Sequence, residues 1–126
     1  MAVRLASEGD RFRETVAFHA QQAVEKYLKA VLVYYQVEFR KTHDIEQLLY
    51  MVREVAPSLA EELMEARWLT PFGVDIRYPR QFPQVLPGDV ARAVRLAQTA
   101  RQAVMSLLGP ILPADTPSDS AGLGEV

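Results

Sequence analysis

The segment AFHAQQAVEKYLKAVLVYYQ, residues 17–36, carries the strongest periodic signal in the 126-residue sequence. Its apolar side chains recur at intervals of three and four residues, and neither glycine nor proline interrupts them. This spacing places them on one face of an α-helix, which must pack against other elements to be buried. We therefore predict a long amphipathic helix from about Arg11 to Gln36, with a break at residues 8–10 and Asp10 as a candidate N-cap.

Two shorter helices are predicted next. The apolar spacing of residues 45–55 describes an amphipathic helix, and Pro57 is expected to end it. The sequence Ser58-Leu59-Ala60-Glu61 has the spacing of a capping box, which predicts a further helix to about Trp68.

A long connection and a last helix follow. Residues 69–88 contain four prolines and two glycines, so we expect a loop that no helix crosses. Asp89 is the expected N-cap of the last helix, and Gly109-Pro110 is its stop signal. The predicted fold is all-α, an up-and-down bundle of four to five helices over residues 1–109, with a flexible tail at 110–126.

Composition limits the chemistry. The chain has no cysteine, which excludes disulfides and cysteine-based zinc sites, and its formal net charge of −2 confines any anion site to a local cluster. No apolar run approaches the ~18–20 residues of a membrane span, and no signal-peptide pattern is present, so we expect a cytoplasmic protein without membrane contact. No motif for a metal or a cofactor is found, and none is expected.

A polar stripe accompanies the apolar face of the long helix. His19, Gln22, Lys26 and Lys29 follow one another at spacings of three, four and three, so they share a face. Their charges and hydrogen-bond donors could hold a phosphate or a nucleotide. The alternative is a solvated helix surface, which the spacing alone favours.

Two other segments are candidates for the same site. Residues 41–44, Lys-Thr-His-Asp, precede the second helix, where His43 would lie in the first turn and Asp44 or Thr42 would cap the helix. Capping alone also explains this segment. In the proline-rich connection, Arg77 and Tyr78 combine a cation with an aromatic ring, which suits a nucleotide or a loop anchor.

The three segments, taken together and in order, resemble the HEPN domain family. The first is FHAQQAVEKYLKA at residues 18–30, the second is KTHDI at residues 41–45 with Leu48-Leu49, and the third extends from LTPF at residues 69–72 to RYP at residues 77–79. The resemblance spans about residues 17–108. Any one of these motifs alone would be weak, whereas their order and spacing are specific.

The resemblance implies a function as well as a fold. Such domains are helical bundles, often homodimers, that resemble the substrate-binding part of nucleotidyltransferases. They are frequently partners of a minimal nucleotidyltransferase in toxin–antitoxin or two-component systems. We therefore expect a non-catalytic partner that binds a nucleotide or polyphosphate through His19, Gln22, Lys26, Lys29, His43, Asp44, Arg77 and Tyr78.

Other HEPN branches are metal-independent ribonucleases with an Arg-x(4–6)-His motif, so an RNA-cleaving toxin is the first alternative. Arg13 and His19 have the sequence spacing of this motif. Six residues along a helix, however, place the two side chains about 120° apart around the helix axis. A dimerising interaction module without a ligand is the second alternative. The family also has a full helix before its signature helix, whereas about seven residues precede Glu8 here. The natural start could therefore lie upstream of Met1, or a dimer partner could cover the exposed core.

Overall fold

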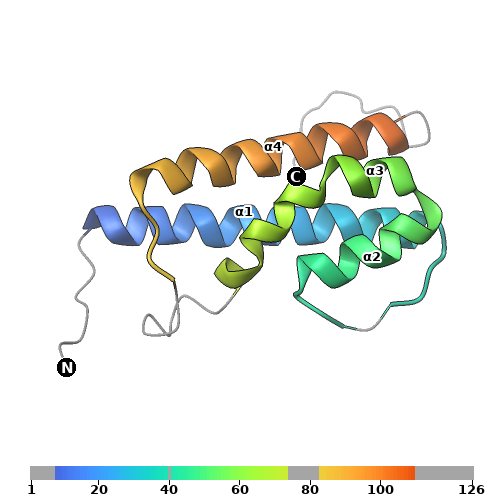
Figure 1. Cartoon of the computed structure of the whole chain (residues 1–126), viewed down its shortest axis with the longest axis horizontal. Helices are drawn as coiled ribbons and strands as arrows, with labels where there is room; N and C mark the ends of the chain where they lie inside the picture. The colour runs from blue at the N-terminus through green and yellow to red at the C-terminus, as the bar shows by residue number, and fades with distance from the viewer. Residues whose placement is uncertain (1–7, 40, 74–82, 110–126) are drawn as a thin grey trace.

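The computed structural model describes residues 8–39, 41–73 and 83–109 of the chain. It contains four α-helices and one 3-10 helix, and no strand within the described residues (Figure 1). The predicted all-α helical bundle is confirmed. The elements are α1 (Glu8–Tyr34), α2 (Ile45–Val55), α3 (Pro57–Glu62), η1 (Met64–Gly73) and α4 (Pro87–Leu108).

Helix α1 begins earlier than the sequence pattern indicates. Glu8, Gly9 and Asp10 are helical, so the predicted break at residues 8–10 is wrong. A glycine in a helix costs only about 1 kcal/mol relative to alanine, and acidic side chains in the first turn interact favourably with the helix dipole. Asp10 acts within this turn, where its carboxylate pairs with Arg13.

The C-terminal end of α1 is closed by backbone hydrogen bonds. Gln36 adopts a left-handed conformation with φ of 57°. The amide of Val37 then donates to the carbonyl of Leu32 at 2.8 Å, and the amide of Gln36 donates to that of Val33 at 2.9 Å. This is the Schellman arrangement, which satisfies carbonyls at the end of the helix. The chain can therefore turn back along α1 towards α2.

Helix α2 has the predicted bounds, but the next elements begin and end differently. Pro57 is the first residue of α3, and the predicted cap at Ser58 is wrong. Proline suits this position because its missing N–H would be unpaired there in any case. The 3-10 helix η1 includes Pro71 and extends to Gly73. The predicted start of the loop at residue 69 is therefore wrong.

Helix α4 begins before its predicted cap. Pro87 is its first residue and Leu86 is the N-cap. Asp89 is therefore not the N-cap; it lies in the first turn, where its carboxylate accepts the amide of Leu86 at 3.0 Å. The helix ends at Leu108, as the Gly109-Pro110 signal predicts. The expected tail at 110–126 and the segment before Glu8 lie outside the described residues.

The hydrophobic core lies between α1 and the elements that surround it. One face of α1 is buried against α4, α2 and η1, as its periodicity predicts. The buried apolar residues that α1 contributes are Ala17, Ala20, Val24, Leu28, Val31 and Leu32.

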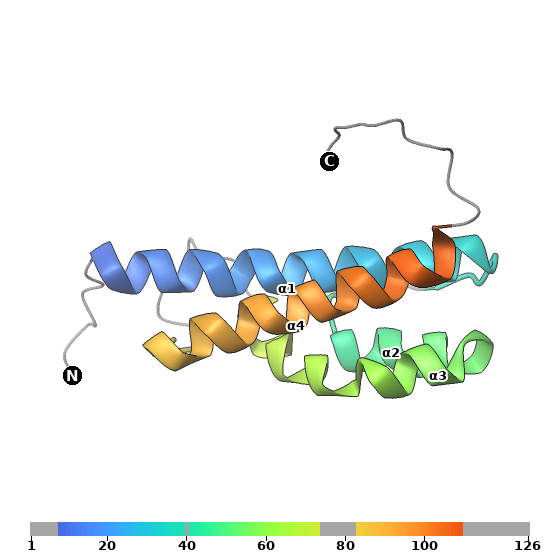
Figure 2. The same ribbon diagram turned by 90° about the horizontal axis from the view of Figure 1, so that it is seen from above.

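The helices do not alternate in direction throughout the bundle. Helices α1 and α4 lie side by side and run the same way, while α3 and η1 return against α2 (Figures 1 and 2). Arg13 near the start of α1 donates through Nε to the carbonyl of Val85, just before α4, at 2.8 Å. The beginnings of α1 and α4 are therefore neighbours.

Candidate functional site

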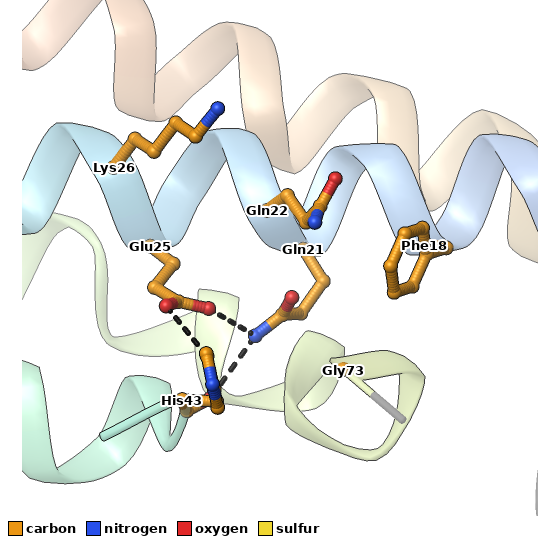
Figure 3. A pocket seen from close by; sticks show the side chains of 7 residues that line it. All are labelled: Phe18, Gln21, Gln22, Glu25, Lys26, His43 and Gly73. Carbon is orange, nitrogen blue, oxygen red and sulfur yellow. Dashed lines mark hydrogen bonds and ion pairs between the residues drawn. The ribbon is translucent and has the colours of Figure 1, made fainter. Parts of the chain in front are cut away.

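A pocket of about 380 Å³ lies where the middle of α1 meets the start of α2 and the end of η1 (Figure 3). We call it the Glu25 pocket, after the carboxylate in its wall. Five of its lining residues come from α1, one precedes α2 and one ends η1. They are Phe18, Gln21, Gln22, Glu25, Lys26, His43 and Gly73.

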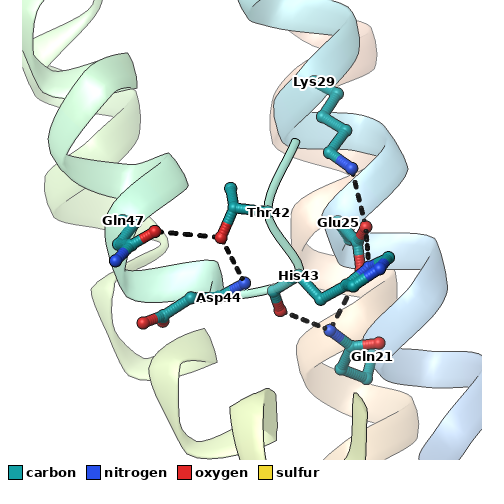
Figure 4. A network of polar contacts seen from close by, with 7 residues as sticks. All are labelled: Gln21, Glu25, Lys29, Thr42, His43, Asp44 and Gln47. Atoms are coloured by element: carbon teal, nitrogen blue, oxygen red, sulfur yellow. Dashed lines mark hydrogen bonds and ion pairs between the residues drawn. The ribbon is translucent and has the colours of Figure 1, made fainter. Parts of the chain in front are cut away.

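Glu25 is the centre of a polar network that joins α1 to the segment before α2 (Figure 4). Its Oε2 lies 2.7 Å from Nζ of Lys29 and 2.8 Å from Nδ1 of His43. Its Oε1 accepts a hydrogen bond of 3.1 Å from Nε2 of Gln21. The Glu25 side chain is only 9% exposed. A carboxylate buried in this way needs several partners, and this one has three.

The balance of these interactions determines the charge of Glu25. Burial disfavours the ionised carboxylate, but hydrogen bonds from Lys29, His43 and Gln21 outweigh it, and the pKa of Glu25 is lowered below its ordinary value. Glu25 is therefore an anion at neutral pH. It neutralises much of the positive charge that Lys29 would otherwise offer to a ligand.

Gln21 connects three elements from a buried position on α1. Besides Glu25, its Nε2 donates to the backbone carbonyl of His43 at 3.0 Å. On its other side the amide packs against Gly73, where a Cβ would lie 2.9 Å from Nε2. The Gln21 side chain is 1% exposed, so it has little room to move.

The start of α2 is capped much as the sequence predicts, except for the position of His43. Oδ1 of Asp44 accepts the amide of Glu46 at 2.9 Å, which makes Asp44 the N-cap. The hydroxyl of Thr42 accepts the amide of Asp44 and donates to the side chain of Gln47. His43 precedes the cap, so its expected place in the first turn is wrong. The amides of Asp44 and Glu46 therefore have partners within the chain.

The structure divides the polar stripe of α1 between two surfaces. Gln22 and Lys26 line the Glu25 pocket, and Lys29 binds Glu25 beside it. His19 instead lies edge-on against Phe18 and lines a second pocket, of about 370 Å³, between α1 and α4. In Figure 3 the side chain of Lys26 extends away from Glu25 and His43, so its ammonium lies at the rim of the pocket.

This second pocket, the α1/α4 groove, is almost entirely apolar. Val16, Ala20, Ala23 and Tyr27 line it from α1, and Val94 and Ala97 line it from α4. His19, Thr15, Gln98 and Arg101 form its polar part. Val94 is 38% exposed. The groove is thus a surface suited to another apolar surface rather than to a phosphate.

The described residues place only some of the predicted site residues at the Glu25 pocket. Arg77 and Tyr78 lie outside the described residues, so the expected closure of the site from the loop stays a prediction. Asp44 caps α2 and does not line the Glu25 pocket. The two residues of the ribonuclease alternative have different neighbours. Arg13 pairs with Asp10 and donates to the carbonyl of Val85, whereas His19 lines the α1/α4 groove.

Gln21 and Glu25 are the site residues that the polar stripe does not identify. Their signal was present in the spacing: residues 21, 25 and 29 are successive i,i+4 neighbours, and Glu25 with Lys29 forms the favourable order of charges on a helix. Their contact with His43 depends on how the chain returns along α1, which periodicity does not describe.

The described part of the chain contains neither a helix that could span a membrane nor a cluster of metal-binding side chains. None of its helices combines the length and the apolar character that a membrane span requires. No three histidine, aspartate or glutamate side chains in residues 8–39, 41–73 and 83–109 gather closely enough to hold a metal ion.

Comparison with known proteins supports the interpretation of the motifs. No curated protein and no solved structure matches the chain. The family model of the HEPN domain matches residues 1–107, which include all of α1 to α3, η1 and nearly all of α4. With its helical bundle and its three motifs in order, the chain belongs to the HEPN domain family.

Proposed function

We propose that this HEPN domain binds a nucleotide or another phosphate-bearing ligand in the Glu25 pocket. In this role it is a non-catalytic, cytoplasmic partner of a minimal nucleotidyltransferase. The observation that carries the proposal is the pocket itself, which gathers Gln22, Lys26 and His43 on one side of the signature helix. The partner role rests on the family and on the sequence motifs.

The charge of the pocket favours an anion only modestly. Lys29 and Glu25 compensate each other as an ion pair. Lys26 is exposed and forms no ion pair among the described residues, so its charge remains available to a ligand. Its flexible stem allows the ammonium to swing over the pocket. With neutral His43, one net positive charge remains, which fits a phosphate held by a single lysine and by neutral donors such as Gln22.

Calorimetric titration with ATP and AMP tests ligand binding. We expect the native protein to bind both nucleotides. Lys26→Ala should lose at least fivefold in affinity, which is about the contribution of one charge-assisted hydrogen bond. Lys41→Ala is the matched control, because Lys41 is exposed and does not line the pocket. Equal loss in both variants would indicate unspecific attraction and would contradict the site. Absence of binding at millimolar nucleotide would contradict the function.

The partner role has its own test. We expect the gene next to this one to encode a small nucleotidyltransferase, and the two proteins to form a complex when they are coexpressed. An unrelated neighbouring gene, or a nucleotidyltransferase that elutes separately, would contradict this part of the proposal.

The α1/α4 groove supports the homodimer that the family resemblance implies. Its apolar lining and the exposed Val94 offer a surface that a second copy of the chain can cover. The groove opens on a different side of α1 from the Glu25 pocket, since the two share no lining residue. A dimer formed there would leave the pocket accessible.

A further inference from the structure

We propose that the Glu25 pocket recognises a hydroxyl group as well as a phosphate, and that Nε2 of His43 is the acceptor for this hydroxyl. The inference deepens the proposed ligand binding, on which it rests, and it narrows the ligand class to phosphates with a free hydroxyl nearby, such as ribonucleotides. It follows from the way in which Glu25 holds the imidazole ring.

The contact with Glu25 fixes the position of the proton on His43. Nδ1 lies 2.8 Å from Oε2 of Glu25, which is a hydrogen-bond distance. An ionised carboxylate can only accept, so Nδ1 must carry the hydrogen. In the neutral ring this leaves Nε2 without a hydrogen and with a lone pair that can accept one.

The position of His43 is fixed from the backbone as well as from the ring. Its carbonyl accepts the Gln21 amide at 3.0 Å, and the next residue, Asp44, is the N-cap of α2. The ring and the main chain of His43 are thus both attached to α1 through the same pair of side chains, Gln21 and Glu25 (Figure 3). Fixed acceptors of this kind favour binding because little freedom is lost when the ligand arrives.

Nε2 of His43 has no partner among the described residues, so it can accept a hydrogen bond from a ligand. The His43 side chain is 71% exposed although its Nδ1 is bound, and it lines the Glu25 pocket. No residue of the described ranges donates to its Nε2. Gln21 and Glu25 also line the pocket, but they bind each other and His43. Lys26, a cation, and Gln22, an amide, are the other polar groups in the lining. A ligand with a hydroxyl donor and a phosphate acceptor complements this set.

The tautomer of His43 is the direct test of the first step. The chain has two histidines, so ¹⁵N-histidine labelling gives two rings, with His19 as the internal reference. We expect the neutral His43 ring to carry its hydrogen on Nδ1 and the ring of His19 to show the Nε2–H preference of free histidine. Hydrogen on Nε2 of neutral His43 would overturn the inference without need of any variant.

Nucleotide discrimination is the test of the second step. AMP should bind the native protein about threefold to tenfold more tightly than 2′,3′-dideoxyadenosine monophosphate, which is the worth of one exposed hydrogen bond. In His43→Asn the side-chain amide can still donate to Glu25, but the Nε2 acceptor is lost. This variant should bind both nucleotides with the affinity of the dideoxy compound.

The outcomes separate the two proposals. Equal binding of AMP and the dideoxy compound to the native protein would overturn hydroxyl recognition and leave phosphate binding in place. Discrimination that persists in His43→Asn would assign the hydroxyl to another residue and would also overturn the inference. If neither nucleotide binds, the proposed function fails and hydroxyl recognition fails with it.

Discussion

Gln21 and Gly73 are in such close contact that no side chain fits between them: a Cβ on Gly73 would lie 2.9 Å from Nε2 of Gln21. The same amide group holds Glu25 and the carbonyl of His43. The glycine at the end of η1 therefore makes room for the network that forms the wall of the Glu25 pocket.

Gly73→Ala should displace the Gln21 side chain and weaken its two hydrogen bonds. We expect the free energy of unfolding to fall by about 1–2 kcal/mol, measured by urea denaturation. Gly88→Ala is the matched control, because a Cβ at Gly88 meets nothing within 4 Å. It should leave stability unchanged or raise it slightly, since alanine is the better helix former. A Gly73→Ala variant as stable as the native protein would contradict the tight packing.

The lowered pKa of Glu25 predicts how stability depends on pH. In the unfolded chain Glu25 titrates near its ordinary value of 4.5, and in the folded protein its pKa is lower. The ionised carboxylate therefore contributes stability that is fully present above the unfolded value and is lost as pH falls through the folded one. Glu25→Gln should cost about 2 kcal/mol at neutral pH, and the difference from the native protein should shrink below about pH 4.

Glu54→Gln provides the control for this measurement. Glu54 lies on α2 and is exposed. Its replacement should leave the unfolding free energy unchanged from neutral pH to pH 4. If Glu25→Gln behaves in the same way, the Glu25 network does not stabilise the fold.

The sequence predicts Asp44 both as a cap and as a ligand residue, and the structure confirms the cap. Asp44→Ala should lower the free energy of unfolding by about 1 kcal/mol, whereas Asp44→Ser should restore most of it because serine caps almost as well. Nucleotide affinity in Asp44→Ser, measured by calorimetry, should equal that of the native protein. Loss of nucleotide binding in Asp44→Ser, which keeps the cap, would show instead that Asp44 contributes to the ligand site.

The α1/α4 groove should be the dimer surface. Val94→Lys places a charge in this groove and should convert a dimer to a monomer in sedimentation velocity experiments. Val33→Lys is the control, since Val33 is 65% exposed and does not line the groove. A dimer that survives Val94→Lys, or a native protein that sediments as a monomer, would rule out this surface.

The sequence predicts those parts of the fold that depend on local patterns. The apolar spacing gives α1 and α2, and the bounds of α2 are correct because Asp44 and Pro57 mark its two sides. Local signals also compete with one another, which explains the errors. Pro57 ends α2 as predicted but also begins α3, and Pro87, which the prediction places in the loop, begins α4, because proline is favourable at the first position of a helix.

The candidate site could be predicted only in part, because it depends on contacts between distant segments. Lys26, Gln22 and His43 were identified from their chemistry, and the structure brings them to one pocket. His19 belongs to the same predicted stripe, but it lines the groove between α1 and α4. The apolar spacing of a helix shows which of its faces is buried, but not which other helix packs against that face. Glu25 organises the pocket through its contact with His43, which lies 18 residues further along the chain and is brought beside it by the fold.

The parallel course of α1 and α4 has an electrostatic consequence. Each helix has a partial positive charge of about half an elementary charge at its N-terminus, and the two N-termini lie at the same end of the bundle. These charges repel each other, but Glu8 and Asp10 lie in the first turn of α1 and Asp89 lies in that of α4. Three carboxylates therefore offset the two helix dipoles at this end of the domain, and they allow two parallel helices to begin side by side.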